Sequence, residues 1–167
     1  MNIAGINYES INDGEGLRTV IYVSGCSHNC KNCHNPKTHD INYGVTFTEE
    51  LKNKIIENIK KRPFVSGLTL SGGDPLHENN ITEVLNFIKL FKDNFPNKTV
   101  WLYTGYKIDN ILNDALKIEI IKLCDVVVDG RYIDKLRDVT LPFSGSKNQR
   151  IIDIKKSLKE NKIVLYK

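Results

Sequence analysis

The sequence lacks long apolar runs, a strong charge imbalance and a secretory leader, and each absence excludes a class of protein. No apolar segment approaches the roughly 20 residues that span a bilayer, so we expect no membrane association. The N-terminus has no charged region followed by an apolar core, so we expect a cytoplasmic protein. The net charge of +4 is spread along the chain, and nucleic-acid binding needs a concentrated basic face, so no nucleic-acid partner is expected.

The chain also lacks internal repeats and low-complexity linkers. Its 167 residues suffice for one domain with a substantial core, and they are fewer than chains that usually divide into several domains. Apolar residues make up 40% of the chain and charged residues 26%, as in globular proteins. We therefore expect a single domain over residues 1–167.

Runs with strand composition alternate with runs of helical periodicity. Residues 1–16 form a polar, turn-rich lead-in. Apolar residues at helical spacing predict three helices, of which the second starts near Ile81. A capping box of Thr46 and Glu49 is expected to start the first helix, and Asp109 to cap the third. The third helix is expected to carry Ile111, Leu112, Ala115 and Leu116. β-Branched and aromatic runs predict strands at 17–24, 65–70, 99–103 and 124–128, with a short fifth at 150–154.

This alternation indicates parallel βαβ units and an α/β fold. A complete eightfold barrel takes about 250 residues, so the chain has room for only about five units. We predict a partial barrel of about five to six parallel strands. Polar, glycine-containing segments follow four of the expected strands, at the edge where parallel α/β folds bind ligands. These segments are the cysteine loop, Gly72-Gly73-Asp74, Thr104-Gly105 and Asp129-Gly130-Arg131.

Three of the four cysteines lie in the loop after the first of these strands. Cys26, Cys30 and Cys33 have the spacing C-x3-C-x2-C, and clustered cysteines outside oxidising compartments more often hold metal than form disulfides. Iron–sulfur clusters normally have four cysteine ligands. Cys124, far along the chain at the start of an apolar strand, is expected to be a buried apolar residue. Three ligands would leave one iron open to an external ligand, as in metal sites that do chemistry.

Zinc is the alternative metal for this loop. The three cysteines with His28 or His34 would make a Cys3His site. Zinc modules usually present paired C-x2-C knuckles, and only Cys30 and Cys33 have that spacing. Spacing therefore favours iron–sulfur over zinc and leaves both open.

Two motifs resemble those of the radical S-adenosylmethionine (SAM) superfamily. The first is Cys26-x3-Cys30-x2-Cys33 followed by His34, and the second is the run Ser71-Gly-Gly-Asp-Pro75. More narrowly, nearly the whole chain is similar to the activating proteins of anaerobic ribonucleotide reductase. That similarity includes Asp13-Gly-Glu-Gly-Leu-Arg-Thr19, Trp101-Leu-Tyr-Thr-Gly-Tyr106, Val128-Asp-Gly-Arg131 and Ser146-Lys-Asn-Gln-Arg150.

The resemblance implies a [4Fe–4S] cluster whose ligands and catalytic residues are Cys26, Cys30 and Cys33. SAM would chelate the open iron and be cleaved reductively, and the resulting radical would take a hydrogen from a glycine of the large catalytic subunit of the reductase. An electron donor such as flavodoxin or a thioredoxin-type reductant is implied as a further partner. The cofactor-binding residues it implies are Asn32, Cys33, His34, Gly72, Gly73, Asp74, Thr104, Asp129 and Arg131.

Asp74 departs from the superfamily pattern, in which many members have Glu at this position. Its shorter carboxylate can still accept a hydrogen bond from an ammonium group. The segment from Asp13 to Arg18 is expected to reach either the cofactor site or the partner.

Other functions remain compatible with the same residues. Another small radical SAM enzyme, such as an activator of a different glycyl-radical enzyme or a deazapurine-forming synthase, would share both motifs. A non-enzymatic zinc-binding module and a plain iron–sulfur electron carrier are alternatives of other classes.

Overall fold

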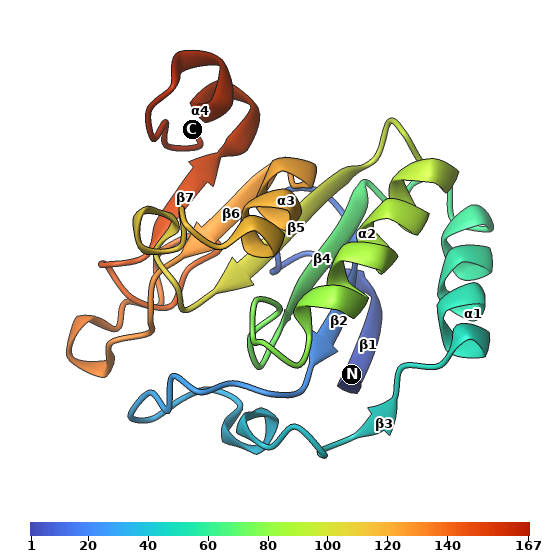
Figure 1. Ribbon diagram of the computed structural model, residues 1–167, viewed down its shortest axis with the longest axis horizontal. Helices are drawn as coiled ribbons and strands as arrows, with labels where there is room; N and C mark the ends of the chain where they lie inside the picture. The colour runs from blue at the N-terminus through green and yellow to red at the C-terminus, as the bar shows by residue number, and fades with distance from the viewer.

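A computed structural model describes residues 1–167 and contains one seven-stranded sheet in the order β3-β1-β2-β4-β5-β6-β7 (Figure 1). The four central strands, β2, β4, β5 and β6, are parallel, and the outer strands β1, β3 and β7 pair antiparallel to their neighbours. The strands are β1 Asn2–Ser10, β2 Arg18–Val23, β3 Val45–Thr46, β4 Gly67–Gly72, β5 Thr99–Thr104, β6 Val126–Asp129 and β7 Arg150–Asp153.

The α/β class and the open sheet confirm the prediction from the sequence. The parallel part has four strands rather than five or six, because β7 returns beside β6 in the opposite direction. The lead-in 1–16 is a further difference, because most of it forms β1, which pairs with β2 at the other side of the sheet. The sheet therefore contains a parallel centre with antiparallel strands on both flanks.

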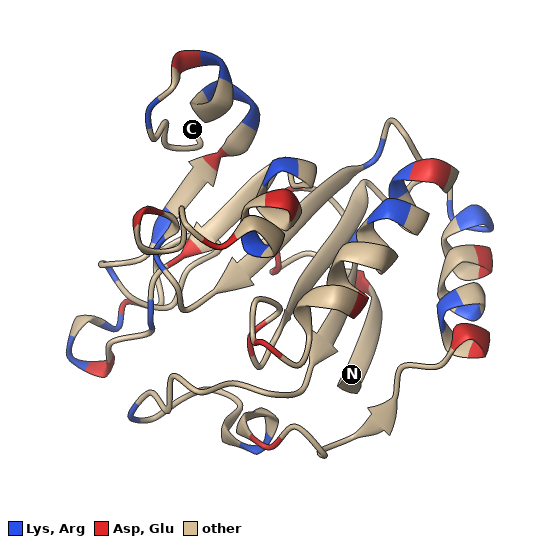
Figure 2. Cartoon of the chain, viewed as in Figure 1, with Lys and Arg blue, Asp and Glu red and all other residues tan.

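Helices α1 (Glu49–Lys60), α2 (Ile81–Asn94) and α3 (Ala115–Leu123) follow one another across one face of the sheet, and the short α4 (Ile154–Glu160) follows β7 (Figure 1). Figure 2 shows lysine and arginine interspersed with aspartate and glutamate along α1 and α2. Several of these charges form pairs one turn apart, such as Lys54 with Glu50.

Two helix starts differ from the expected ones. Thr46 lies in β3, and the hydroxyl of Thr48 instead accepts a hydrogen bond from the amide of Leu51 at 3.3 Å to cap α1. Asp109 lies in the 3-10 turn Ile108–Asn110, and Asp114 caps α3 by accepting from the amide of Lys117 at 3.1 Å. Ile111 and Leu112 consequently precede α3 rather than belong to it.

Alternate residues of β5 face opposite sides of the sheet, as the two-residue repeat of a strand requires. Val100 and Leu102 belong to the main core beneath the helices, which also contains the buried apolar residues of α1 and α2. Trp101 belongs to a smaller cluster on the opposite face, with Tyr103 packed against it. That opposite face carries the site described below. No helix is both long enough and apolar enough to cross a membrane.

Candidate cluster and cofactor site

The carboxyl ends of the four parallel strands meet at one edge of the sheet. Val23 at the end of β2 lies beside Gly72 at the end of β4, and Thr104 at the end of β5 lies beside Asp129 at the end of β6. The polar segments that follow these strands are therefore neighbours in space, as the sequence predicts.

The cysteine loop folds back on itself, so that its three thiols line one cavity of about 150 Å³. Cys26, Cys30 and Cys33 are all partly buried and none forms a disulfide. Asn29 and Asn32 adopt positive φ values of 48° and 54°, a conformation that asparagine accepts more readily than most residues. The Asn32 side chain also donates to the carboxylate of Asp134 at 2.9 Å, which ties the loop to the segment after β6.

Burial raises the pKa of the Cys26 thiol to about 11, and the nearby carboxylate of Asp74 and the other two thiols act in the same direction. The amide of His28 opposes this shift by favouring the thiolate. Metal ligation requires the thiolate, so binding at this residue releases a proton.

Cys124 lies at the other edge of the sheet, before β6 begins. Its side chain is buried, its thiol donates to the carbonyl of Ile120 at 3.3 Å, and burial raises its pKa. The predicted burial of this cysteine is confirmed, and three thiols remain at the site edge.

Asp74 lies behind the cavity wall and is 1% exposed. Its Oδ1 accepts from the amide of Leu76 at 2.8 Å and from the hydroxyl of Thr104 at 2.9 Å. Its Oδ2 lies 2.7 Å from Nε2 of His28 and accepts from the amide of Gly105 at 2.9 Å. Both oxygens of this carboxylate therefore already have hydrogen-bond partners within the protein, although the sequence suggested that the carboxylate accepts a hydrogen bond from an ammonium group.

Gly72 and Gly73 both line the small cavity. A Cβ added to Gly72 would lie 2.6 Å from the backbone nitrogen of Val23, and one added to Gly73 would lie 2.6 Å from the carbonyl oxygen of Gly25. Glycine is thus required at both positions by the close packing of β4 against the start of the cysteine loop. This packing presents the backbone of both glycines to the cavity.

The remaining predicted residues are divided between the cavity and the scaffold. Thr104 lines the small cavity. Asp129 is fully buried, where its Oδ1 accepts from Nε of Arg150 and its Oδ2 from the amide of Ile108, both at 2.9 Å, so it organises the scaffold beside the site. Arg131 is exposed, and its guanidinium donates to the backbone carbonyl of His28.

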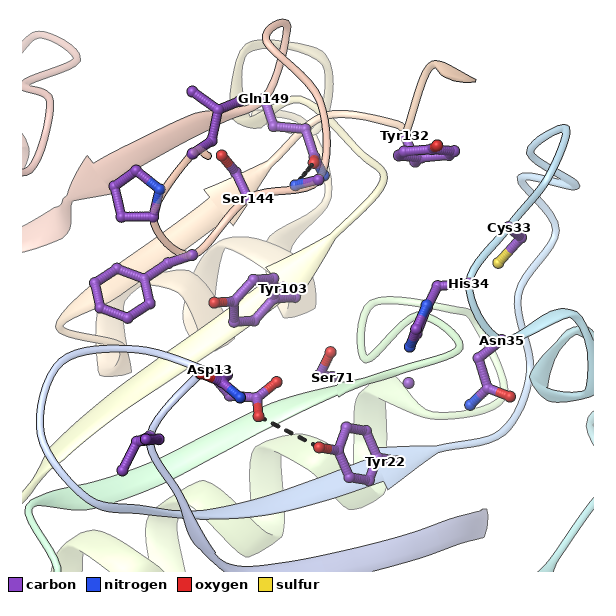
Figure 3. A pocket seen from close by; sticks show the side chains of 17 residues that line it. Asp13, Tyr22, Cys33, His34, Asn35, Ser71, Tyr103, Tyr132, Ser144 and Gln149 are labelled. Atoms are coloured by element: carbon purple, nitrogen blue, oxygen red, sulfur yellow. Dashed lines mark hydrogen bonds between the residues drawn. The ribbon is translucent and has the colours of Figure 1, made fainter. Parts of the chain in front are cut away.

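A second, larger cavity of about 740 Å³ adjoins the first and shares Cys33, Gly72 and Tyr103 with it. Its volume lies within the ~300–1,000 Å³ typical of small-molecule pockets. Figure 3 shows His34 and Asp13 on opposite sides of this space. The residues that line it are Ile11, Asn12, Asp13, Tyr22, Cys33, His34, Asn35, Ser71, Gly72, Tyr103, Tyr132, Leu141, Pro142, Phe143, Ser144, Gly145 and Gln149.

Tyrosine hydroxyls are among the polar groups of this cavity that the sequence motifs do not identify. The hydroxyl of Tyr22 donates to Asp13 at 3.3 Å, and burial together with that carboxylate raises the pKa of Tyr22 to about 12. The Tyr103 hydroxyl is buried without a hydrogen-bond partner, and burial raises its pKa as well. Unpaired buried polar atoms are rare, so the Tyr103 hydroxyl marks a position where a ligand can supply a partner. Strand alternation from Trp101 to Tyr103 was the signal that could have located it.

The donor set fits an iron–sulfur cluster. Three thiols surround one cavity, and the cavity continues into a space large enough for a second small molecule. The ligand atoms of Cys26, His28 and Asp74 lie within 4.8 Å of one another, which is the arrangement closest to the zinc alternative. However, the His28 nitrogen nearest to them is hydrogen-bonded to Asp74.

Comparison with known proteins agrees with this donor set. Residues 12–152 match the family model of the 4Fe-4S single cluster domain. The anaerobic ribonucleoside-triphosphate reductase-activating protein of Salmonella typhimurium is 39% identical over 138 residues, covering 82% of this chain and 88% of that protein. The protein of the same name from Haemophilus influenzae is 41% identical over 140 residues, covering 83% and 89%, and that of Enterobacteria phage T4 is 38% identical over 139 residues, covering 83% and 85%.

Fold, cysteine loop and family match together define an iron–sulfur activating enzyme of the radical SAM class. Within that class, the chain belongs to the family of anaerobic ribonucleoside-triphosphate reductase-activating proteins.

Proposed function

We propose that this enzyme cleaves SAM reductively at a [4Fe–4S] cluster and generates the glycyl radical of anaerobic ribonucleotide reductase. The observation that carries the proposal is the pair of adjoining cavities, because three thiols line the smaller one and the larger one begins beside Cys33. A cluster with three protein ligands has one iron free for an external ligand, and the larger cavity provides space for that ligand.

The cofactors would supply the difficult chemistry. One electron from the bound cluster would split SAM into methionine and a 5′-deoxyadenosyl radical, which would take a hydrogen atom from a substrate glycine to give 5′-deoxyadenosine and a glycyl radical. Reducing equivalents would come from an electron donor such as flavodoxin or a thioredoxin-type reductant.

The protein's own residues would bind and orient the reactants. Cys26, Cys30 and Cys33 would hold the cluster. The half-buried backbone of Gly72 and Gly73, with Thr104 beside it, would line the position of the SAM amino acid portion. His34 faces the larger cavity from the cluster side, where it would contact the adenine end of SAM. The Tyr103 hydroxyl would donate its unpaired hydrogen bond to the bound cofactor or substrate.

The substrate would be a glycine-bearing segment of the large catalytic subunit of the reductase. The sheet does not close into a barrel, and the larger cavity is partly open to the surface. Asp13 and Phe143 line this cavity from two different loops and would contact the incoming segment. A glycine segment would approach the cluster through this opening, because the helices cover the other face of the sheet (Figure 1).

Anaerobic reconstitution followed by measurement of iron, labile sulfide and 5′-deoxyadenosine tests this proposal. We expect about four irons per chain, as a [4Fe–4S] cluster requires, and 5′-deoxyadenosine that forms only with SAM and a reductant. A colourless protein with one bound zinc would support the zinc-binding module instead. A reduced iron–sulfur protein that leaves SAM intact would be an electron carrier.

A further inference from the structure

His28 lies between two of the cluster cysteines, and its side chain is only 11% exposed. Four groups surround it. Nε2 lies 2.7 Å from the Asp74 carboxylate, and the ring meets Tyr106 edge-on with 4.6 Å between centroids. The backbone of Gly105 packs directly on the ring, since a Cβ there would lie 2.3 Å from Cδ2 of His28. Arg131 donates to its backbone carbonyl. We call Asp74, Gly105, Tyr106 and Arg131 the His28 socket.

The His28 socket is anchored to three strands. Asp74 follows β4, Gly105 and Tyr106 follow β5, and Arg131 follows β6. The Asp74 carboxylate is fixed by three further donors and is almost completely buried. The amide of Asp74 also donates to the carbonyl of Gly25 at 2.8 Å, so Asp74 binds the cysteine loop at two points. A side chain seated here has little freedom to move relative to the strand ends.

We propose that His28 is a positioning residue of the cluster site: seated in the His28 socket, it fixes the Cys26–Cys30 half of the cysteine loop against the strand ends and is not itself a metal ligand. This inference rests on the proposed cluster site and does not depend on SAM cleavage. It also accounts for aspartate at position 74, because the carboxylate must fit between His28, Thr104 and the Gly105 amide.

Fixing the loop has two consequences for a bound cluster. Residues outside the ligand shell that orient the ligands commonly change metal affinity by about 10–100-fold when replaced. The amide of His28 also lies close enough to Cys26 to favour its thiolate, and hydrogen bonds to the ligand sulfurs contribute to cluster potentials. Displacing His28 should therefore weaken retention of the cluster and shift its midpoint potential.

The most selective perturbation is Gly105→Ala, because it adds one methyl group against the His28 ring and removes no polar group. His28→Ala empties the His28 socket. Gly5→Ala is the matched control, since a Cβ at Gly5 has no atom within 4 Å. The double variant His28→Ala/Gly105→Ala distinguishes this mechanism from general damage, because the three atoms nearest to a Cβ at Gly105 all belong to the His28 ring.

Each protein is reconstituted anaerobically, and its folding is checked by circular dichroism. Iron and sulfide content, the rate of cluster loss to an excess of a ferrous chelator, and the midpoint potential are then measured. Gly105→Ala and His28→Ala should lose the cluster about tenfold faster than the wild type or more, with a shifted potential, while Gly5→Ala matches the wild type. The double variant should behave as His28→Ala.

Three results would overturn the inference. Gly105→Ala and His28→Ala could keep the wild-type rate and potential, or the two substitutions could be additive in the double variant. Spectroscopy could also show a histidine nitrogen bound to iron in the wild type and not in His28→Ala. A wild-type protein that takes up no cluster would instead refute the proposed function, and this outcome is distinct from the other three.

Discussion

Replacing Arg18 with methionine should destabilise the protein and disturb the larger cavity while leaving the cluster in place. Arg18 is completely buried and has no carboxylate partner among its hydrogen bonds. Its guanidinium donates to both Thr69 and Leu68 at 2.7 Å, and its carbon lies 5.5 Å from the centre of the Trp101 ring. Burial lowers its pKa to about 10, so it remains charged at neutral pH.

The destabilisation follows from the acceptors that lose their donor. Arg18 also donates to the carbonyl of Glu15 at 3.0 Å and to the side chain and carbonyl of Thr99 at 2.9 and 3.1 Å. An unsatisfied buried acceptor costs about 1–3 kcal/mol, and the threonine hydroxyls can find other partners, so we expect a loss of about 3 kcal/mol. For a chain of this size, that lowers the melting temperature by about 6–12 °C.

The functional effect follows from a second connection. The hydroxyl of Thr69, which accepts from Arg18, donates to the carbonyl of Asp13 at 2.8 Å, so Arg18 helps to fix the loop that lines the larger cavity. Arg18 has no hydrogen bond to the cysteine loop. We therefore expect Arg18→Met to keep the iron content of the wild type and to lose most of its reductase activation.

Thermal unfolding by circular dichroism, iron analysis and a reductase activation assay test this reasoning together. Arg62→Met is the control, because Arg62 forms an ion pair with the half-exposed Glu9 and such surface pairs contribute only about 0–1 kcal/mol. A shift of about 2 °C in melting temperature corresponds to about 1 kcal/mol or less for a chain of this size. An Arg18→Met protein that melts within that range of the wild type would contradict the structural role given to Arg18. Loss of iron, or reductase activation equal to that of the wild type, would also contradict it.

Three further outcomes are expected. Alanine at any one of the three loop cysteines should abolish SAM cleavage, as measured by 5′-deoxyadenosine, whereas Cys124→Ala should retain both cluster and cleavage; loss of the cluster in Cys124→Ala would contradict the three-ligand site. Asp125→Asn should lower the free energy of unfolding by about 1–3 kcal/mol at neutral pH. Burial raises the pKa of Asp125, but hydrogen bonds from Lys155, Lys92 and the Val100 amide outweigh it and hold the pKa below its ordinary value. The stabilisation is present above pH about 4 and is lost as the pH falls through the depressed folded pKa, so denaturant titrations should show the gap to Asp125→Asn narrowing below that pH; a constant gap would exclude an ionic origin.

The central strands could be predicted because their apolar runs are fully buried and end in polar, glycine-containing turns. β1 could not, because it lies towards one side of the sheet and its sequence, NIAGINYES, mixes polar and apolar residues without a clear period. The cap of α3 was misplaced because Asp109 and Asp114 both precede apolar residues, and only tertiary packing selects the second. α4 follows β7 without an intervening loop, so the sequence has no turn residues that would indicate where the helix begins.

The parts of the site that could be predicted are the motifs whose residues lie close together in the sequence. The cysteine spacing and the strand-end glycines identify residues that are close in sequence. The roles of Asp74 and Asp129 depend on partners that are distant in the sequence, namely His28 in the cysteine loop, Thr104 in β5 and Arg150 in β7. The sequence shows a carboxylate at each position but does not show whether other protein groups already form hydrogen bonds with it.

The proposed reaction places a glycyl radical on the large subunit of anaerobic ribonucleotide reductase. Electron paramagnetic resonance of the two proteins mixed anaerobically, with SAM and a reductant, measures that radical directly. We predict a glycyl radical signal that requires SAM, the reductant and all three loop cysteines. The signal should be split when the substrate glycine carries ordinary hydrogen at its Cα, and the splitting should collapse when that position carries deuterium. The absence of any protein radical, from a preparation with an intact cluster that cleaves SAM, would contradict the account.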